Sequence, residues 1–100
     1  MAAIDGKWKA SAPSPLGVQY FDLDLQSDGD VVTGTVIYKG TSGPINNGKL
    51  DGDSFYFEMT IETPIGPGVF KCTTKLDGDT LSGPMRVPGG RTKLTANRVV

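Results

Sequence analysis

The motif Asp-Gly-Asp occurs three times in this chain, each time between two apolar runs. The copies are Asp28-Gly29-Asp30, Asp51-Gly52-Asp53 and Asp77-Gly78-Asp79. Asp-Gly between alternating apolar segments is the strongest short signal for a β-hairpin, because a type I′ turn needs positive φ at both central residues. Glycine adopts positive φ freely, and aspartate tolerates it better than most residues. The chain is therefore predicted to contain three tight hairpins.

Between these turns, apolar and polar side chains alternate as they do along a β-strand. In Val18–Gln26, for example, Phe21, Leu23 and Leu25 fall on one side. The same pattern predicts eight strands: Gly6–Ala12, Val18–Gln26, Val32–Lys39, Ile45–Leu50, Ser54–Ile61, Phe70–Leu76, Leu81–Met85 and Leu94–Arg98. Two asparagines and Gly48 interrupt the alternation of the fourth, which predicts a bulge there. No segment has helical periodicity.

Successive connections of an antiparallel meander alternate between the two ends of the sheet. The three Asp-Gly turns therefore fall at one end. The predicted loops Pro13–Pro15, Gly40–Pro44, Thr63–Pro67 and Pro88–Gly90 fall at the other. Eight strands of about 7–9 residues can close into a barrel, which removes exposed edges. We predict one all-β domain over residues 1–100, an up-and-down barrel with a tight end and a loop-lined mouth. A two-sheet β-sandwich is the alternative.

Several function classes are disfavoured by what the chain lacks. Histidine is absent and Cys72 is the only cysteine, so a Ser-His triad and an internal disulfide are excluded, and zinc is disfavoured. The paired aspartates resemble calcium ligands, but the full loop with its closing glutamate is missing and turn chemistry explains them. Cys72 alternates with apolar neighbours and is predicted to be a core residue. We expect no metal and no cofactor.

Charge and hydropathy set the expected partners and compartment. The net charge of -1 gives no reason to expect nucleic acid, and no apolar run approaches the roughly 20 residues that span a bilayer. Residues 1–5 lack the basic and apolar regions of a signal peptide, and a lone cysteine fits a reducing compartment. The expected location is cytoplasmic. Removal of an export signal is left open.

A resemblance to a known superfamily lies at the two ends of the chain. Gly6-Lys7-Trp8 opens the first strand, and Arg98 lies late in the last, on neighbouring strands after closure. An arginine stacked on a tryptophan would plug the Asp-Gly end by a cation–π contact. This arrangement resembles the calycins, which comprise lipocalins, fatty-acid-binding proteins and avidin-like proteins. The 28–35 segment is also similar to a hairpin of avidin-like barrels. The resemblance implies a barrel that binds a ligand, although not biotin, because Trp8 is the only tryptophan.

We expect a ligand to bind at the end of the barrel opposite the Asp-Gly turns. The inner-face residues predicted there are Gln19, Tyr38, Asn46, Met59, Phe70, Met85 and Thr92, with Arg86 and Arg91 at the rim. Apolar walls with a few convergent polar groups are typical of a small-molecule pocket. Small inner residues, namely Ala10, Ala12, Gly34 and Gly83, would leave volume for a ligand. The alternative is a lumen filled by its own aromatic and methionine side chains.

Three functions remain open at this point. The leading one is non-catalytic binding of a small, apolar or amphipathic molecule at the mouth. The second is a cofactor-free enzyme, an isomerase, cyclase or hydrolase, that uses Tyr38 with Arg91 or Arg86, or inward-turned Glu58 or Glu62. The third is a structural module that forms a homodimer through outer residues Tyr20, Ile37 and Tyr56.

Overall fold

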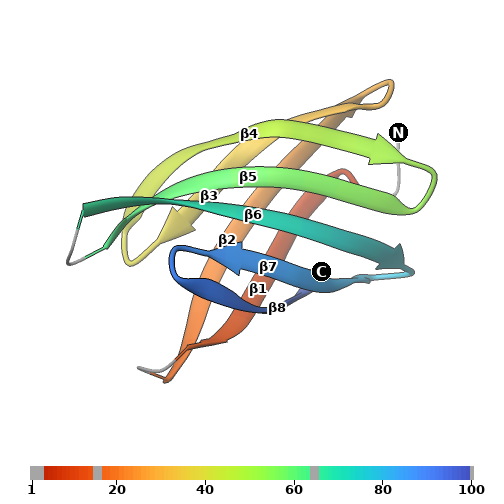
Figure 1. The fold of residues 1–100 in the computed structure, drawn as a ribbon. Coiled ribbons are helices and arrows are strands. Elements are labelled where there is room, and N and C mark those ends of the chain that lie inside the picture. The colour runs from red at the N-terminus through yellow and green to blue at the C-terminus, as the bar shows by residue number, and fades with distance from the viewer. Residues whose placement is uncertain (1–3, 15–16, 64–65, 100) are drawn as a thin grey trace.

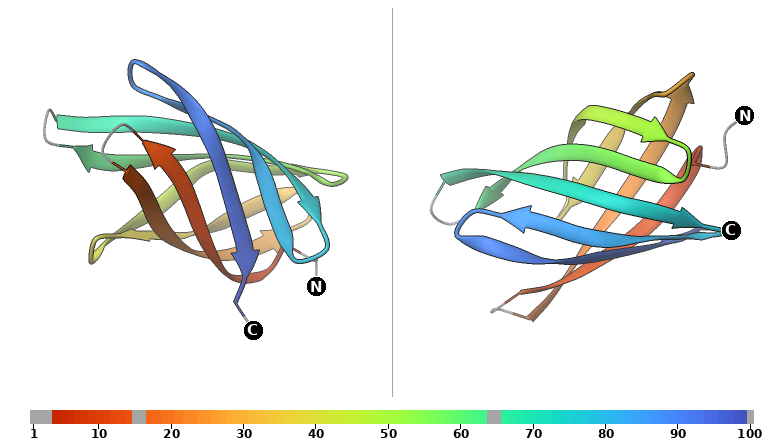
Figure 2. Two further views of the ribbon diagram at one scale, coloured as in Figure 1. Left: turned by 90° about the horizontal axis from the view of Figure 1, so that it is seen from below. Right: turned by 45° about the vertical axis from the view of Figure 1, so that its right-hand side comes forward.

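The computed structural model describes residues 4–14, 17–63 and 66–99, which form one closed antiparallel β-barrel (Figure 1). The strands are β1 (Gly6–Ser14), β2 (Gly17–Asp28), β3 (Val31–Tyr38), β4 (Thr41–Asp51), β5 (Ser54–Thr63), β6 (Gly66–Asp77), β7 (Thr80–Val87) and β8 (Gly90–Arg98). Each strand pairs with its sequence neighbours, and β8 lies beside β1 to close the wall (Figure 2). The predicted up-and-down barrel is confirmed, and the β1–β8 pairing excludes the sandwich. The described residues include no helix of the length and apolar character that crossing a membrane requires.

The three Asp-Gly-Asp segments form tight turns, but of a different type from the one predicted. Asp28 pairs with Val31, so the central residues of the first turn are Gly29 and Asp30. Positive φ falls on the glycine alone at each site, with 65° at Gly29, 62° at Gly52 and 61° at Gly78. Glycine with positive φ at the first central position is the type II′ arrangement. The type I′ prediction was wrong because the first aspartate of each motif ends a strand instead of entering the turn.

A type I′ turn lies at the opposite end of the barrel instead. Lys39 and Gly40 have φ of 51° and 79°, and they join the paired residues Tyr38 and Thr41. The predicted loop Gly40–Pro44 was therefore wrong, because its last four residues belong to β4. Lysine is an unusual residue at positive φ, and the Asp-Gly signal that marks such turns is missing here.

The other predicted loops are also shorter than expected. Pro88-Gly89 forms a two-residue turn, and Gly90 already belongs to β8. β1 continues to Ser14, and Thr63 and Gly66 are strand residues. The remaining parts of those predicted loops, Pro15, Pro64 and Ile65, lie outside the described residues. The proline and glycine content predicted a mouth lined by loops. In the described residues, this end of the barrel is formed by long strands instead.

Between its paired positions, β4 contains one residue more than the facing stretch of β3 and one more than the facing stretch of β5. This extra residue is the predicted bulge. The register of β4 against β5 shifts between Asn46 and Lys49, and its register against β3 shifts correspondingly. Asn47, inside this interval, has a φ of 53°. An extra residue reverses the alternation of side chains, so Ile45 is buried and Asn46 is exposed. The prediction that Asn46 faces the lumen was wrong for this reason.

Three strand glycines permit close approach of neighbouring backbones. A Cβ atom at Gly34 would lie 2.1 Å from the Asp24 carbonyl oxygen, and one at Gly83 would lie 2.0 Å from that of Thr73. Gly48 has the same relation to Val32, at 2.1 Å. Glycine in a strand often marks such a contact. The prediction that Gly34 and Gly83 leave lumen volume for a ligand was wrong, because backbone of the adjacent strand occupies that space.

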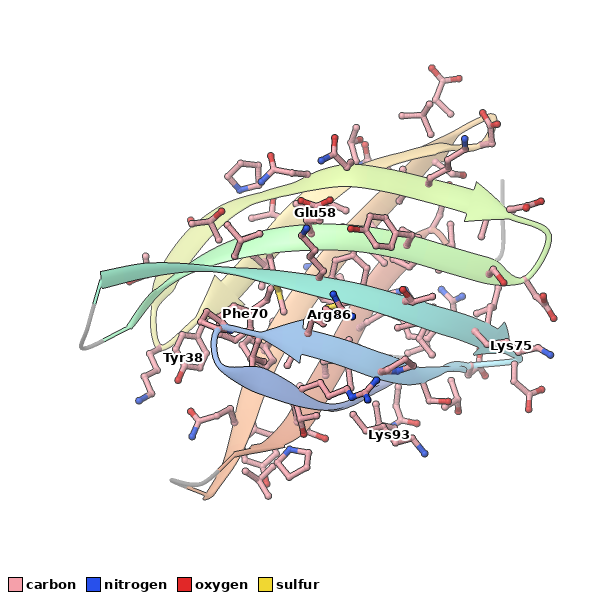
Figure 3. All side chains as sticks on the ribbon, in the orientation of Figure 1. Tyr38, Glu58, Phe70, Lys75, Arg86 and Lys93 are labelled. Carbon is pink, nitrogen blue, oxygen red and sulfur yellow. The ribbon has the colours of Figure 1, made fainter. Side chains whose placement is uncertain are left out.

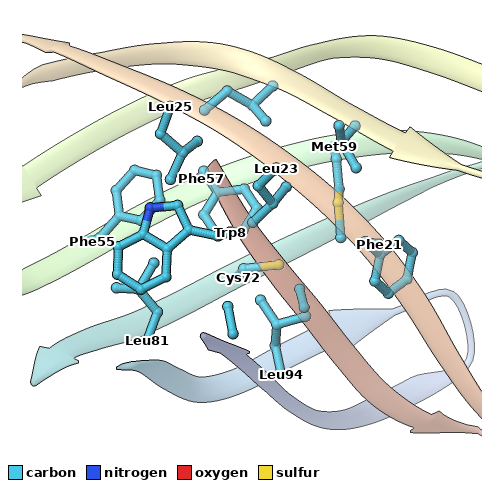
Figure 4. Close-up of a cluster of buried hydrophobic side chains, with 14 of the residues drawn as sticks. Trp8, Phe21, Leu23, Leu25, Phe55, Phe57, Met59, Cys72, Leu81 and Leu94 are labelled. Carbon is cyan, nitrogen blue, oxygen red and sulfur yellow. The ribbon is translucent and has the colours of Figure 1, made fainter. Parts of the chain in front are cut away.

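The lumen is packed with the barrel's own side chains. Trp8, Phe55, Phe57, Met59 and Cys72 are fully buried at its centre, as the close-up in Figure 4 shows. The only buried polar side chain among the described residues belongs to Thr74, whose hydroxyl donates to the Phe55 carbonyl oxygen at 2.8 Å. An eight-stranded barrel has room for side chains or for one small ligand. In this barrel, side chains occupy the centre, and Cys72 is the core residue that was predicted.

The close approach at Gly34 gives a test of this packing. We expect Gly34→Ala to lower the free energy of unfolding by about 3 kcal/mol, because the added methyl group forces two strands apart. Gly43→Ala is the matched control, since a Cβ atom at Gly43 meets nothing within 4 Å and its φ is not in the left-handed region. Urea denaturation measures both. Equal stability of the two variants would contradict the close packing of β2 and β3.

Candidate functional site

The Asp-Gly end of the barrel is closed by Trp8 and Arg98. The Arg98 guanidinium lies 4.4 Å from the centre of the Trp8 ring, and its Nη1 atom donates to the Asp5 carbonyl oxygen at 2.5 Å. Its Nε atom donates to Asp79 Oδ1 at 3.0 Å. Glycine is favoured at position 6 because its φ is 126°, a conformation that other residues rarely adopt, and a Cβ atom there would also lie 2.9 Å from Arg98 Nη1. These contacts account for the Gly-X-Trp motif and the late arginine as one structural unit.

The segment before β1 is attached to this end by further hydrogen bonds. The Trp8 indole donates to the Ile4 carbonyl oxygen at 3.0 Å, and the Ser27 amide donates to Asp5 Oδ1 at 2.7 Å. Hydrogen bonds from the side chain and backbone of Ser27 hold the pKa of Asp5 below its ordinary value. The groups named here are engaged in closing the barrel.

Two of the predicted mouth residues come together. The Tyr38 hydroxyl donates to Gln19 Oε1 at 2.5 Å. The Tyr38 ring stacks on Phe21 with a centroid distance of 5.0 Å, and the Lys39 ammonium lies 5.3 Å from the centre of the same ring. Tyr38 is half-buried against the core. The tyrosine is therefore held in one position on the inner side of the barrel, where it covers the end of the lumen.

The other predicted ligand residues do not join this group. Met59 and Met85 are core residues with exposures of 0% and 2%. Phe70 packs on the same core. Met59 is labelled in Figure 4 and Phe70 in Figure 3. Arg91 is exposed on the outer side of β8. The Thr92 hydroxyl donates to the Pro13 carbonyl oxygen at 2.8 Å and so bridges β8 to β1. Together with outward-facing Asn46, these positions do not form the pocket outlined from the sequence.

A hollow lies instead in the wall of the barrel, where β4 and β5 separate. Their pairing ends at Ile45 and Met59. Because Tyr38 and Thr41 flank a two-residue turn, alternation directs the backbone groups of Ser42, Pro44 and Asn46 towards β5. Proline has no N–H to donate, so Pro44 removes one of the hydrogen bonds that would continue the ladder with β5. The proline and the bulge together explain why the strands part at this point.

This β4–β5 hollow has a volume of about 160 Å³. Its lining residues are Val36, Tyr38, Lys39, Thr41, Ser42, Gly43 and Thr60. Val36 and the Tyr38 ring provide apolar surface, three hydroxyl groups can donate or accept hydrogen bonds, and Lys39 provides a positive charge. Except for Tyr38, these residues were missed as a site. Thr41, Ser42 and Gly43 lie in a segment that was predicted to be a loop. The other three lie in predicted strands but were not assigned to the ligand site: Val36, Lys39 and Thr60. Pro44 was the residue in the sequence that could have indicated this site, because a proline within a strand cannot donate a hydrogen bond to the neighbouring strand.

The described residues do not assemble the groups that the enzymatic reading requires. Arg86 and Arg91 are exposed on the outer face, away from half-buried Tyr38. The Tyr56 hydroxyl donates to Glu58 at 2.7 Å, which raises the pKa of Tyr56 to about 12 and lowers that of Glu58. Burial raises the pKa of the Cys72 thiol to about 12, so it is not a nucleophile at neutral pH. Within the same residues, no group of three acidic, cysteine or histidine side chains could hold a metal ion.

The outer residues proposed for a dimer also lie apart. Tyr20 and Ile37, with exposures of 71% and 42%, lie on β2 and β3, whereas Tyr56 is on β5 and is bonded to Glu58. These three residues do not form one surface.

No protein-family model matches the chain, and no curated protein matches it in sequence. The barrel itself is consistent with a calycin-like fold.

The closed end gives a prediction about pH. A carboxyl group whose pKa is lowered by folding stabilises the fold above its unfolded pKa and loses that contribution as the pH falls through its folded pKa. The ordinary value for Asp5 is 3.8. We expect the emission of Trp8, the only tryptophan, to stay constant from neutral pH to below 3.8 and then to shift to the red. In Asp5→Ala this transition should disappear. A wild-type midpoint at or above 3.8 would contradict the Asp5–Ser27 interaction.

Proposed function

We propose that this chain is a non-catalytic, calycin-like barrel that binds a small amphipathic molecule in the β4–β5 hollow. The observation that carries the proposal is the opening of the wall beside Tyr38. Apolar surface, hydroxyl groups and one cation converge there within about 160 Å³. A concave site with apolar walls and a few polar groups that fix orientation is the usual form of a small-molecule site.

The size of the hollow limits what it can accept. Sites for drug-sized ligands enclose about 300–1,000 Å³, so this hollow suits a smaller molecule or one end of a larger molecule. A long acyl chain would have to enter the lumen, where Phe57 and Met59 already fill the space with exposures of 0%. The ligand class is therefore compact.

The lining also indicates the chemistry of the ligand. Val36 and the ring of Tyr38 offer contact for an aromatic or aliphatic part. Lys39 and the hydroxyl groups of Thr41 and Ser42 would face an acceptor such as a carboxylate or carbonyl oxygen. Because Gln19 and Phe21 hold Tyr38 in place, the apolar wall is formed before the ligand arrives. A preformed wall lowers the entropic cost of binding.

Filling the hollow tests the proposal. A side chain at Gly43 would project into open space without backbone strain, so Gly43→Leu should fold normally and occlude the hollow. Gly90→Leu is the matched control, because Gly90 also has open space around it but lies outside the hollow. We expect small aromatic carboxylates in a fragment set to shift amide resonances of residues 36–43 in wild type and Gly90→Leu, and to lose this effect in Gly43→Leu.

Two results would contradict this function. One is that no member of the set perturbs residues 36–43. The other is that Gly43→Leu, shown to be folded by its melting curve, binds the fragments as well as the wild type.

A further inference from the structure

The outer face of the barrel carries an uneven pattern of charge. Between β1 and β2, lysines face aspartates: Lys7 pairs with Asp24, and Lys9 with Asp22. Between β6, β7 and β8 the opposite holds, because Lys71 pairs with Arg86 and Arg86 pairs with Arg91. Opposite charges in cross-strand pairs stabilise a sheet, and like charges directly opposite each other destabilise it. The like-charge pairs on β6, β7 and β8 therefore lower the stability of the folded sheet.

We use the term basic face for the outer side of β6, β7 and β8, with its five cations Lys71, Lys75, Arg86, Arg91 and Lys93. Figure 3 shows Lys75, Arg86 and Lys93 on these strands. All five residues are exposed. In the sequence, the only acidic residues after Glu62 are Asp77 and Asp79, at the β6–β7 turn, and Arg98 already binds Asp79 at 3.0 Å.

Acidic groups that could neutralise the basic face are scarce in the part of the chain that the structure describes. Lys75 has the only ion pair of the five, with Asp53 at 3.8 Å. Glu58 is opposite Lys71 in the register, and its carboxylate both accepts the Tyr56 hydroxyl at 2.7 Å and interacts with the Lys71 charge. Arg86, Arg91 and Lys93 form no ion pair with any described residue. Within the row Lys71, Arg86 and Arg91, the two arginines thus carry unneutralised charge, whereas Lys71 faces Glu58.

We propose that the basic face binds a flexible linear chain of phosphates, such as the backbone of single-stranded nucleic acid or polyphosphate. Adjacent strands lie about 4.8 Å apart, so cations in the same row can contact successive phosphates of a strand that crosses the sheet. The guanidinium groups of Arg86 and Arg91 match phosphate geometry in a bidentate manner. This site is separate from the β4–β5 hollow and does not depend on the proposed function.

The shape and composition of the basic face favour a flexible chain over other anions. A closed barrel is convex, so a chain can follow its surface, whereas a flat bilayer would touch only the central row. No aromatic side chain lies on the described outer positions of β6, β7 or β8, so stacking on bases is not expected. Binding should therefore be independent of sequence and dominated by phosphate contacts. The net charge of -1 conceals this local surplus.

Fluorescence anisotropy with a labelled oligodeoxythymidine at varied salt concentration tests the proposal. Lys71→Gln/Arg86→Gln/Arg91→Gln removes the row, and Lys7→Gln/Lys9→Gln/Lys49→Gln removes equal charge elsewhere. We expect wild-type binding that weakens with salt, at least about tenfold weaker binding in the row variant, and a small loss in the control. The slope of log K against log salt should fall by about 2, since each contact with a single strand contributes about 0.7. Competition by inorganic polyphosphate shows whether the phosphate chain alone is sufficient.

Several outcomes would overturn the proposal: no binding at low salt, equal loss in both variants, or binding only to vesicles of anionic phospholipid. Folding is checked separately by thermal melting. Because the row variant relieves repulsion, it should melt at or above the wild-type temperature. A clearly lower melting temperature would contradict the charge argument itself.

Discussion

Closure of the barrel depends on the seam between β1 and β8, where the described residues form four register pairs. At the end of this seam Trp8 pairs with Arg98, whose guanidinium covers the indole and also bonds to Asp5 and Asp79. A cation–π contact of this kind contributes about 1–2 kcal/mol when desolvated, and here it is combined with hydrogen bonds to two different segments. The arginine therefore ties the last strand, the start of the chain and the β6–β7 turn together. Gly6 is part of the same unit, since its φ of 126° favours glycine and a Cβ atom there would crowd the guanidinium.

With one end closed and the centre filled, the irregularity that forms the hollow lies in β4. Its extra residue changes the register against both neighbours, and Pro44 removes the donor that would continue pairing with β5. The proposed binding site follows from these two local departures from a regular ladder. The proposed phosphate-binding face follows from a different feature, the like-charge row on β6, β7 and β8, where side chains of the same charge lie opposite each other.

Much of the fold could be predicted from the sequence, because it is encoded locally. Period-two alternation places Leu23 and Phe57 inside, and the Asp-Gly signals locate three turns. The candidate site could not be predicted in the same way. One inserted residue near Asn47 reverses every later side chain of the strand, and the sequence does not show where it falls. Lys39-Gly40 lacks the usual turn signal, so the strand that lines the hollow was taken for a loop. Cross-strand charge pairs such as Arg86 with Arg91 can be predicted only when the strand register is known. Composition and net charge carry no information about the register.

Backbone hydrogen exchange tests the separation of β4 from β5 most directly. The amide of Glu58 lies within the ladder, opposite Asn46, whereas Thr60 and Ser42 lie beyond its last pair. We predict slow exchange for the Glu58 amide and fast exchange for the amides of Thr60 and Ser42, because groups outside a ladder exchange without global unfolding. Protection of Thr60 and Ser42 equal to that of Glu58 would show that the two strands stay paired. The wall would then be continuous, and the proposed site would not exist.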